Sequence, residues 1–204
     1  MPSQKSTAGK KTIAPKRERG RLRVAAILDA GALLFTEKGY DAVTMTEVAA
    51  RADTAIGSLY RFFPSKELLA EALMRRFAER MIAGLAAILA AAPGMKPPAL
   101  ADALVALWLE LARDRTAAVV LVDVQPDADN RRALLRDLAR RRLAAILAAN
   151  RPLAKSKAAA MARVVLHLLK AVPGFAAEDA AGKTKSLVEL RAALAAYLES
   201  RARP

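Results

Sequence analysis

A short run in the first third of the chain carries side chains that could contact a polyanion. Its members are either small or hydrogen-bond donors: Ala55, Gly57, Ser58, Tyr60 and Arg61. Small residues let a backbone approach a ligand closely, while a phenol and a guanidinium can donate to phosphate oxygens or guanine edges. Lys66 follows as a phosphate-seeking charge. These residues predict contact with nucleic acid rather than covalent catalysis.

Three short helices must position these side chains. Apolar residues at helical spacing begin after Arg21 and predict a first helix that ends at Gly39. Thr44 with Glu47 three residues later is a capping-box signature, which predicts the start of a second helix. A tight turn then leads into the third, and this arrangement is typical of a helix-turn-helix unit.

The turn before the third helix has two acidic or hydroxyl residues that can shape it. Asp53 and Thr54 can end the second helix and cap the third, and Asp53 can also pair with Arg51. Pro64 ends the third helix, and Ser65 is a good N-cap for a fourth that runs to about Leu89.

The rest of the chain also favours helices. Breaks are expected at Pro93-Gly94, Pro152 and Pro173-Gly174. Residues 116–124 fit helix or strand by periodicity, and their helical surroundings favour helix. The sequence predicts an all-α protein of about nine helices, with a helix-turn-helix domain followed by a larger helical domain.

Composition and charge limit the kinds of site that this chain can form. The chain has 204 residues, of which 54% are hydrophobic and 4% are aromatic, and its net charge is +14. It has no cysteine, which excludes disulfides and cysteine-based zinc sites. Eight Lys/Arg and one Glu lie within residues 1–23. We expect a disordered basic arm over 1–20, a DNA-binding domain over 21–68 and an effector-binding and dimerisation domain over 69–204. Deleting the arm would show whether it contacts DNA.

Residues 21–69 resemble the tetracycline-repressor (TetR) family. The resemblance rests on Phe35-Thr36-Glu37-Lys38-Gly39-Tyr40, on Thr44 to Ala49, and on the run from Ala52 to Glu67 that contains Gly57-Ser58-Leu59-Tyr60-Arg61-Phe62-Phe63-Pro64-Ser65-Lys66. It implies a dimeric regulator, more often a repressor than an activator, that binds a palindromic operator and is released by a small effector. Ala55 stands where the family commonly has serine, so Thr54 could serve as cap or contact instead.

The resemblance also implies roles for individual residues. Positions that usually touch the DNA backbone are Thr44, Thr46, Tyr60 and Lys66. Positions that face bases or adjoining phosphates are Thr54, Ala55, Ile56, Ser58 and Arg61.

Two further sets of residues are candidates in the larger domain. An apolar pocket for a hydrophobic or aromatic effector would be lined by Met81, Leu85, Leu104, Trp108, Leu111 and Val120. Two apolar stripes wide enough for a core and a homodimer partner are Met161, Val165, Leu168 and Leu169, with Leu187, Leu190, Leu194 and Tyr197. The arginines of residues 131–142 favour a solvated face, partly paired with Asp137, over a second DNA site.

Other functions have less support. No Gly-x-Ser-x-Gly, His-Glu-x-x-His or other catalytic constellation is present, so we expect no enzyme activity, no metal and no cofactor. No apolar stretch is long enough to favour a membrane span, so a cytoplasmic protein is expected. The alternatives are a nonspecific nucleoid or RNA-binding protein, which would bind all sequences alike, and an enzyme with an apolar pocket, which would turn over a bound molecule.

Overall fold

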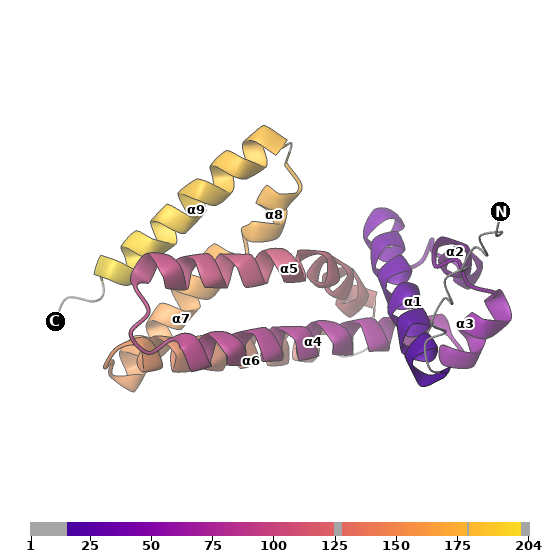
Figure 1. Cartoon of the computed structure of the whole chain (residues 1–204), viewed down its shortest axis with the longest axis horizontal. Coiled ribbons are helices and arrows are strands. Elements are labelled where there is room, and N and C mark those ends of the chain that lie inside the picture. The colour runs from indigo at the N-terminus through magenta and orange to yellow at the C-terminus, as the bar shows by residue number, and fades with distance from the viewer. Residues whose placement is uncertain (1–15, 125–127, 179, 201–204) are drawn as a thin grey trace, which may run out of the picture.

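The first three helices form one end of the molecule. The computed structural model describes residues 16–124, 128–178 and 180–200, and these contain helices and no strand. Helix α1 (Lys16–Lys38) stands across this end, with α2 (Met45–Arg51) and α3 (Ile56–Phe62) on its outer side (Figure 1). Gly39 ends α1 as predicted, with a φ of +79° that suits glycine.

Helix α1 begins five residues earlier than the sequence predicts. Residues 16–20 were expected in a disordered arm because they lack large apolar side chains, yet they form the first turn of α1. Lysine, arginine and glutamate are good helix formers, and Glu18 lies in the first turn, where a negative charge complements the helix dipole. Residues 1–15, the rest of the expected arm, lie outside the described residues.

Six helices form the larger body. They are α4 (Lys66–Ala91), α5 (Pro97–Val124), α6 (Ala128–Asn150), α7 (Lys155–Leu169), α8 (Val172–Ala176) and α9 (Ala180–Ser200). Helix α4 packs against α5 and α6, α6 packs against α7, and α9 slopes across α5 (Figure 1). The described part of the chain thus has nine helices, and the all-α prediction is confirmed, with residues 116–124 continuing α5 as helix.

The end of α7 differs from the prediction. Pro173-Gly174 was expected to stop this helix, but α7 ends at Leu169 and both residues lie inside α8. Proline is tolerated in the first turn of a helix because its missing N–H has no intrahelical partner there. The stretch Lys155–Ala176 is apolar and long enough to resemble a membrane span by composition, but it is divided between α7 and α8, and one face of α7 is buried against the core.

One continuous core joins the three-helix end to the larger body. It runs from Ile27 and Phe35 of α1, through Leu69 and Leu73 of α4, to Leu198 of α9. Gly31 of α1 packs close to Leu69 and Leu73, so the DNA-binding end rests directly on α4.

Gly84 allows α4 and α5 to pack closely. A methyl group added there would overlap Leu107 Cδ1 and lie 2.9 Å from Cδ2. Overpacking of this kind costs about 1–3 kcal/mol, which exceeds the gain of about 0.8–1 kcal/mol for replacing glycine in a helix. We therefore expect Gly84→Ala to lower the denaturant midpoint of unfolding.

The matched control is Gly31→Ala. Its new methyl group would lie 3.4 Å from Leu69 Cδ2 and 3.5 Å from Leu73 Cδ1, which is ordinary contact. This variant should unfold at the same denaturant concentration as the unmodified chain or higher. If Gly84→Ala is as stable as Gly31→Ala, the close packing of α4 on α5 is contradicted.

Candidate nucleic-acid interface

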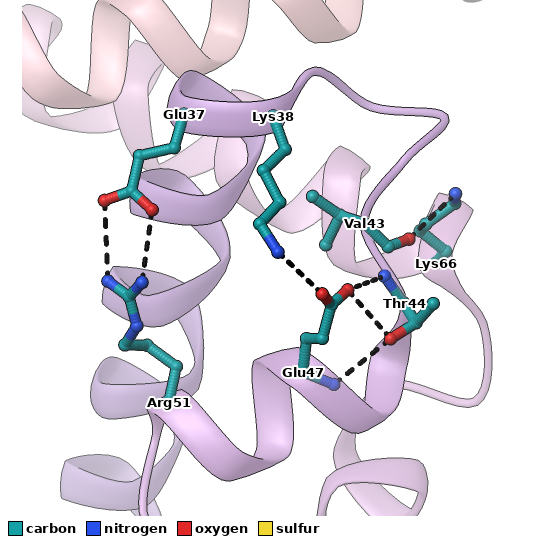
Figure 2. Close-up of polar contacts among 7 residues, drawn as sticks. All are labelled: Glu37, Lys38, Val43, Thr44, Glu47, Arg51 and Lys66. Atoms are coloured by element: carbon teal, nitrogen blue, oxygen red, sulfur yellow. Dashed lines mark hydrogen bonds and ion pairs between the residues drawn. The ribbon is translucent and has the colours of Figure 1, made fainter.

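Helix α2 begins with the capping box that the sequence predicts. Thr44 Oγ1 accepts a hydrogen bond of 3.2 Å from Glu47 N, and Glu47 Oε2 accepts one of 2.8 Å from Thr44 N (Figure 2). These reciprocal bonds satisfy two backbone donors that a helix start leaves without partners. They fix the point at which the chain turns toward α3.

Two ion pairs fasten α2 to the end of α1. Lys38 Nζ lies 2.7 Å from Glu47 Oε1, and Arg51 Nη2 lies 3.1 Å from Glu37 Oε2 (Figure 2). Arg51 thus pairs with Glu37 and not with Asp53, the alternative that the sequence left open. Asp53 instead occupies the left-handed region with a φ of +47°, which aspartate tolerates better than most residues and which turns the chain sharply between α2 and α3.

The charge of Glu47 makes this corner sensitive to acid. Hydrogen bonds from Lys38, the Thr44 backbone and the Thr44 hydroxyl, in that order, lower the pKa of Glu47 from 4.5 to about 2. A lowered carboxyl pKa means that its contribution to stability is present above pH 4.5 and is lost as the pH falls through about 2.

We expect Glu47→Gln to be less stable than the unmodified chain at neutral pH, by a margin that narrows as the pH falls toward 2. Thermal unfolding of both proteins across this range measures the margin. A margin that stays constant throughout the range would contradict the role of the Glu47 carboxylate.

Helix α3 turns one side inward and presents the other to solvent. Leu59 is fully buried, while Ile56, Gly57, Tyr60 and Arg61 are exposed. An added Cβ at Gly57 would meet no atom within 4 Å, so this face is open at its first turn. Small residues, an apolar side chain and hydrogen-bond donors thus share one exposed surface, which could fit the major groove of DNA.

The cap of α3 differs from the expectation. The N-cap residue is Ala55, which has no side-chain cap, and Thr54 makes no capping hydrogen bond. Thr44, Thr46 and Ala55 are exposed, and Thr54 and Ser58 are half-buried. Together with Ile56, Tyr60 and Arg61, these are eight of the nine predicted DNA-contacting residues. All eight lie in or next to α2 and α3.

Lys66 has a different role from the predicted one. Its Nζ donates to the carbonyl oxygen of Val43 at 3.1 Å (Figure 2). It also donates to the carbonyl oxygens of Tyr40 and Asp41 at 3.0 and 3.3 Å, and it lies 4.4 Å from the centre of the Tyr40 ring. A lysine ammonium has three N–H donors, and all three are used here. Lys66 therefore holds the α1–α2 loop, and its contact with phosphate stays a prediction.

Tyr40 of the same loop also contacts the start of α4. Burial, followed by the nearby Glu67 carboxylate, raises the pKa of Tyr40 to about 12. Its hydroxyl donates to Glu67 Oε1 at 3.2 Å. Tyr40 and Lys66 thus hold the α1–α2 loop against the start of α4.

The sequence reasoning missed Arg23. This exposed residue of α1 donates from Nη1 to Ser58 Oγ of α3 at 3.4 Å. Arg19 lies one turn earlier on the same side of α1 and is also exposed. The spacing of Arg19 and Arg23 with the buried Ile27 could have revealed that this side of α1 faces α3.

The predicted effector-pocket residues lie within the core. Met81 and Leu85 of α4 and Leu104, Trp108 and Leu111 of α5 are all buried there. The side chain of Val120 lies outside the described residues. Among the side chains that are described, no group of three or more His, Asp or Glu could hold a metal ion.

Most of the predicted dimer residues are buried inside the subunit. On α7 these are Met161, Val165 and Leu169, and on α9 they are Leu187, Leu190 and Leu194. Leu168 and Tyr197 are half-buried. These side chains therefore serve the subunit's own core, and the contact with a second subunit stays a prediction. The large apolar side chains left exposed on these helices are Val164 and Val188.

The arginine-rich helix shows the expected pairing. Arg141 Nη2 lies 2.6 Å from Asp137 Oδ2 one turn earlier on α6. The side chains of Arg131 and Arg132 lie outside the described residues.

Comparisons with known proteins match the segment that contains α2 and α3. Residues 27–73 match the family model of the bacterial regulatory proteins of the tetR family. The transcriptional repressor KstR of Rhodococcus jostii (strain RHA1) is 58% identical over 52 residues, which are 25% of this chain and 24% of KstR. The chain thus matches about a quarter of the length of this relative.

Solved structures extend the likeness to the body. A transcriptional regulator from Aquifex aeolicus VF5 has a TM-score of 0.63 at 22% identity, covering 87% of this chain and 98% of that chain. A TetR-family regulator from Streptomyces coelicolor has a TM-score of 0.54 at 29% identity, again covering 87% and 98%. Residues 27–73 are thus similar to the bacterial regulatory proteins of the tetR family, and the described part of the chain shares its fold with solved regulators.

Proposed function

We propose that this chain is a sequence-specific DNA-binding transcription regulator that acts as a repressor. Helix α3 enters the major groove of an operator and reads bases through Arg61, Ser58 and the apolar Ile56. Tyr60, Thr44 and Thr46 contact the phosphate backbone on either side. The chain would act in the cytoplasm, where bacterial DNA is accessible.

The observation that carries this proposal is the exposed face of α3 and its rigid support. Helix α3 presents Gly57, Tyr60 and Arg61 to solvent. The capping box at Thr44 and the ion pair between Lys38 and Glu47 fix the preceding helix. A reading helix needs such support because base contacts depend on orientation. The match to the tetR family model covers this whole segment.

A homodimer and an effector complete the proposal. Two copies would read the two halves of a palindrome, with α7 and α9 of each subunit packing together through the exposed Val164 and Val188. A small apolar or aromatic effector would bind in the body, near Trp108, and favour a spacing of the two α3 helices that does not fit DNA. A monomer by sedimentation at micromolar concentration would contradict the dimer.

The experiment is enrichment of genomic DNA fragments by the purified chain, with and without a metabolite extract. A repressor of this kind enriches a few fragments that share a palindrome and releases them when its effector is present. Enrichment of all fragments alike would contradict the proposal and favour a nonspecific nucleic-acid-binding protein.

We also propose that Arg23 contacts a phosphate beside α3. Its single hydrogen bond to Ser58 is long at 3.4 Å, and a guanidinium has five N–H donors, so most of them are available to DNA. Each phosphate contact steepens the dependence of log affinity on log salt concentration by about 0.9.

Arg23→Gln should therefore flatten this salt dependence by about 0.9 and weaken binding to all fragments by similar factors. The control is Arg163→Gln, an exposed arginine on α7, whose salt dependence should equal that of the unmodified chain. Parallel plots for Arg23→Gln and the unmodified chain would show that Arg23 does not contact DNA.

A further inference from the structure

A buried aspartate joins two helices of the body. Asp114 of α5 is 3% exposed and is the one buried charged residue among the side chains described. Its two carboxylate oxygens accept from Arg76 Nη2 at 2.6 Å and from Arg80 Nη1 at 2.7 Å, both on α4. The two arginines compensate the cost of burying this charge.

Arg76 also reaches the DNA-binding end. Its Nη1 lies 2.8 Å from Asp29 Oδ1 on α1, so one guanidinium links α1, α4 and α5. Helix α1 stands across the ends of α4 and α5 (Figure 1), and it packs on both. Arg76 therefore lies where the reading module, formed by α1, α2 and α3, meets the body, formed by α4 to α9.

The geometry of this guanidinium makes it sensitive to movement of α5. Asp114 is almost fully buried, so losing Arg76 would leave Arg80 as the partner of its charge, whereas Asp29 is 60% exposed and can be solvated by water. If α5 shifts along α4, Arg76 must follow Asp114 and release Asp29. The contact between Arg76 and Asp29 thus has two discrete states, formed and broken.

We propose that Arg76 couples the body to the reading module through Asp29, so that the position of α5 decides whether this contact holds α1, and with it α3, against the body. This inference rests on the function proposed above and names the means by which that site is regulated. Coupling between two sites is reciprocal. Binding of DNA to α3 must therefore change the packing of α5, even with no effector present.

Trp108 can report this change. It is the single tryptophan of the chain, is 3% exposed and lies on α5. Asp114 is six residues further along the same helix, a rise of about 9 Å. A shift of α5 alters the surroundings of the indole and hence its fluorescence emission.

The test compares two alanine variants. Asp29→Ala removes the link between Arg76 and α1. Asp102→Ala is the matched control, because Asp102 has a similarly exposed side chain, at 64%, and its ion pair with Arg191 joins α5 to α9 within the body. Each protein is titrated with a labelled fragment from the enrichment experiment, following the anisotropy of the label and the emission of Trp108.

We expect DNA binding to change Trp108 emission in the unmodified chain and in Asp102→Ala. In Asp29→Ala the anisotropy should still report binding, while the emission change falls to less than half. A full emission change in Asp29→Ala, or none in the unmodified chain, would overturn the inference. If anisotropy shows that the unmodified chain prefers no fragment, the proposed function itself fails.

Discussion

Asp114→Ala is expected to lower the free energy of unfolding by about 1.5–3 kcal/mol, the usual contribution of a hydrogen bond to a charged group, because Arg76 and Arg80 lose their bonds to this buried carboxylate. Asp114 is 3% exposed and bonded to both Arg76 and Arg80. Without it, Arg76, which is only 17% exposed, keeps its bond to Asp29 and loses the one to α5. The packing of α4 on α5 loses its polar connection at the same point.

The control for this prediction lies on the same helix. Asp102 of α5 is also ion-paired, but its side chain is 64% exposed and the distance to Arg191 is 3.4 Å. Exposed pairs contribute about 0–1 kcal/mol. Urea unfolding of Asp114→Ala, Asp102→Ala and the unmodified chain measures both effects, and equal midpoints for the two variants would contradict the structural role of Asp114.

Local signals in the sequence predicted much of the reading module. The capping box at Thr44 and Glu47 and the stop at Gly39 are formed as expected. Both depend on residues within a few positions of each other, so spacing alone is sufficient to recognise them. The inward Leu59 and outward Tyr60 of α3 likewise follow from the helical period.

Contacts between distant residues could not be predicted in this way. Lys66 was expected to bind phosphate, but the α1–α2 loop brings three carbonyl oxygens to its ammonium. Arg51 has a nearby acidic residue in sequence, Asp53, yet its partner is Glu37, 14 residues away. Pairing of exposed charges is decided by how helices cross, which periodicity does not reveal.

The apolar stripes of α7 and α9 show a related limit. Periodicity correctly indicates which sides of these helices are apolar, and Val165 and Leu194 are fully buried. It does not indicate whether such a side packs in its own subunit or against a partner, because both environments favour the same residues.

Arg61→Ala is expected to have the largest effect on DNA recognition. Arg61 is exposed near the end of α3, and its guanidinium lies 5.3 Å from the centre of the Phe62 ring. Contact with the ring face orients the guanidinium and leaves its N–H edges for a ligand. A bidentate contact with a guanine contributes about 1–3 kcal/mol of discrimination, so its loss should reduce sequence preference about 5- to 150-fold.

Arg163→Ala is the matched control for this substitution. Arg163 is an exposed arginine on α7, in the body rather than the reading module. Both variants remove one positive charge, so the two have the same net charge. A difference between them therefore reports what the Arg61 side chain does in the groove.

The measurement that tests the account most directly is the ratio of affinities for an enriched fragment and for the same fragment with its palindrome shuffled. It is made on the unmodified chain, Arg61→Ala and Arg163→Ala at one salt concentration. We expect a large ratio for the unmodified chain and Arg163→Ala, and a ratio at least about fivefold smaller for Arg61→Ala. An unchanged ratio in Arg61→Ala, or no preference in the unmodified chain, would contradict the assignment of α3 as the helix that reads DNA.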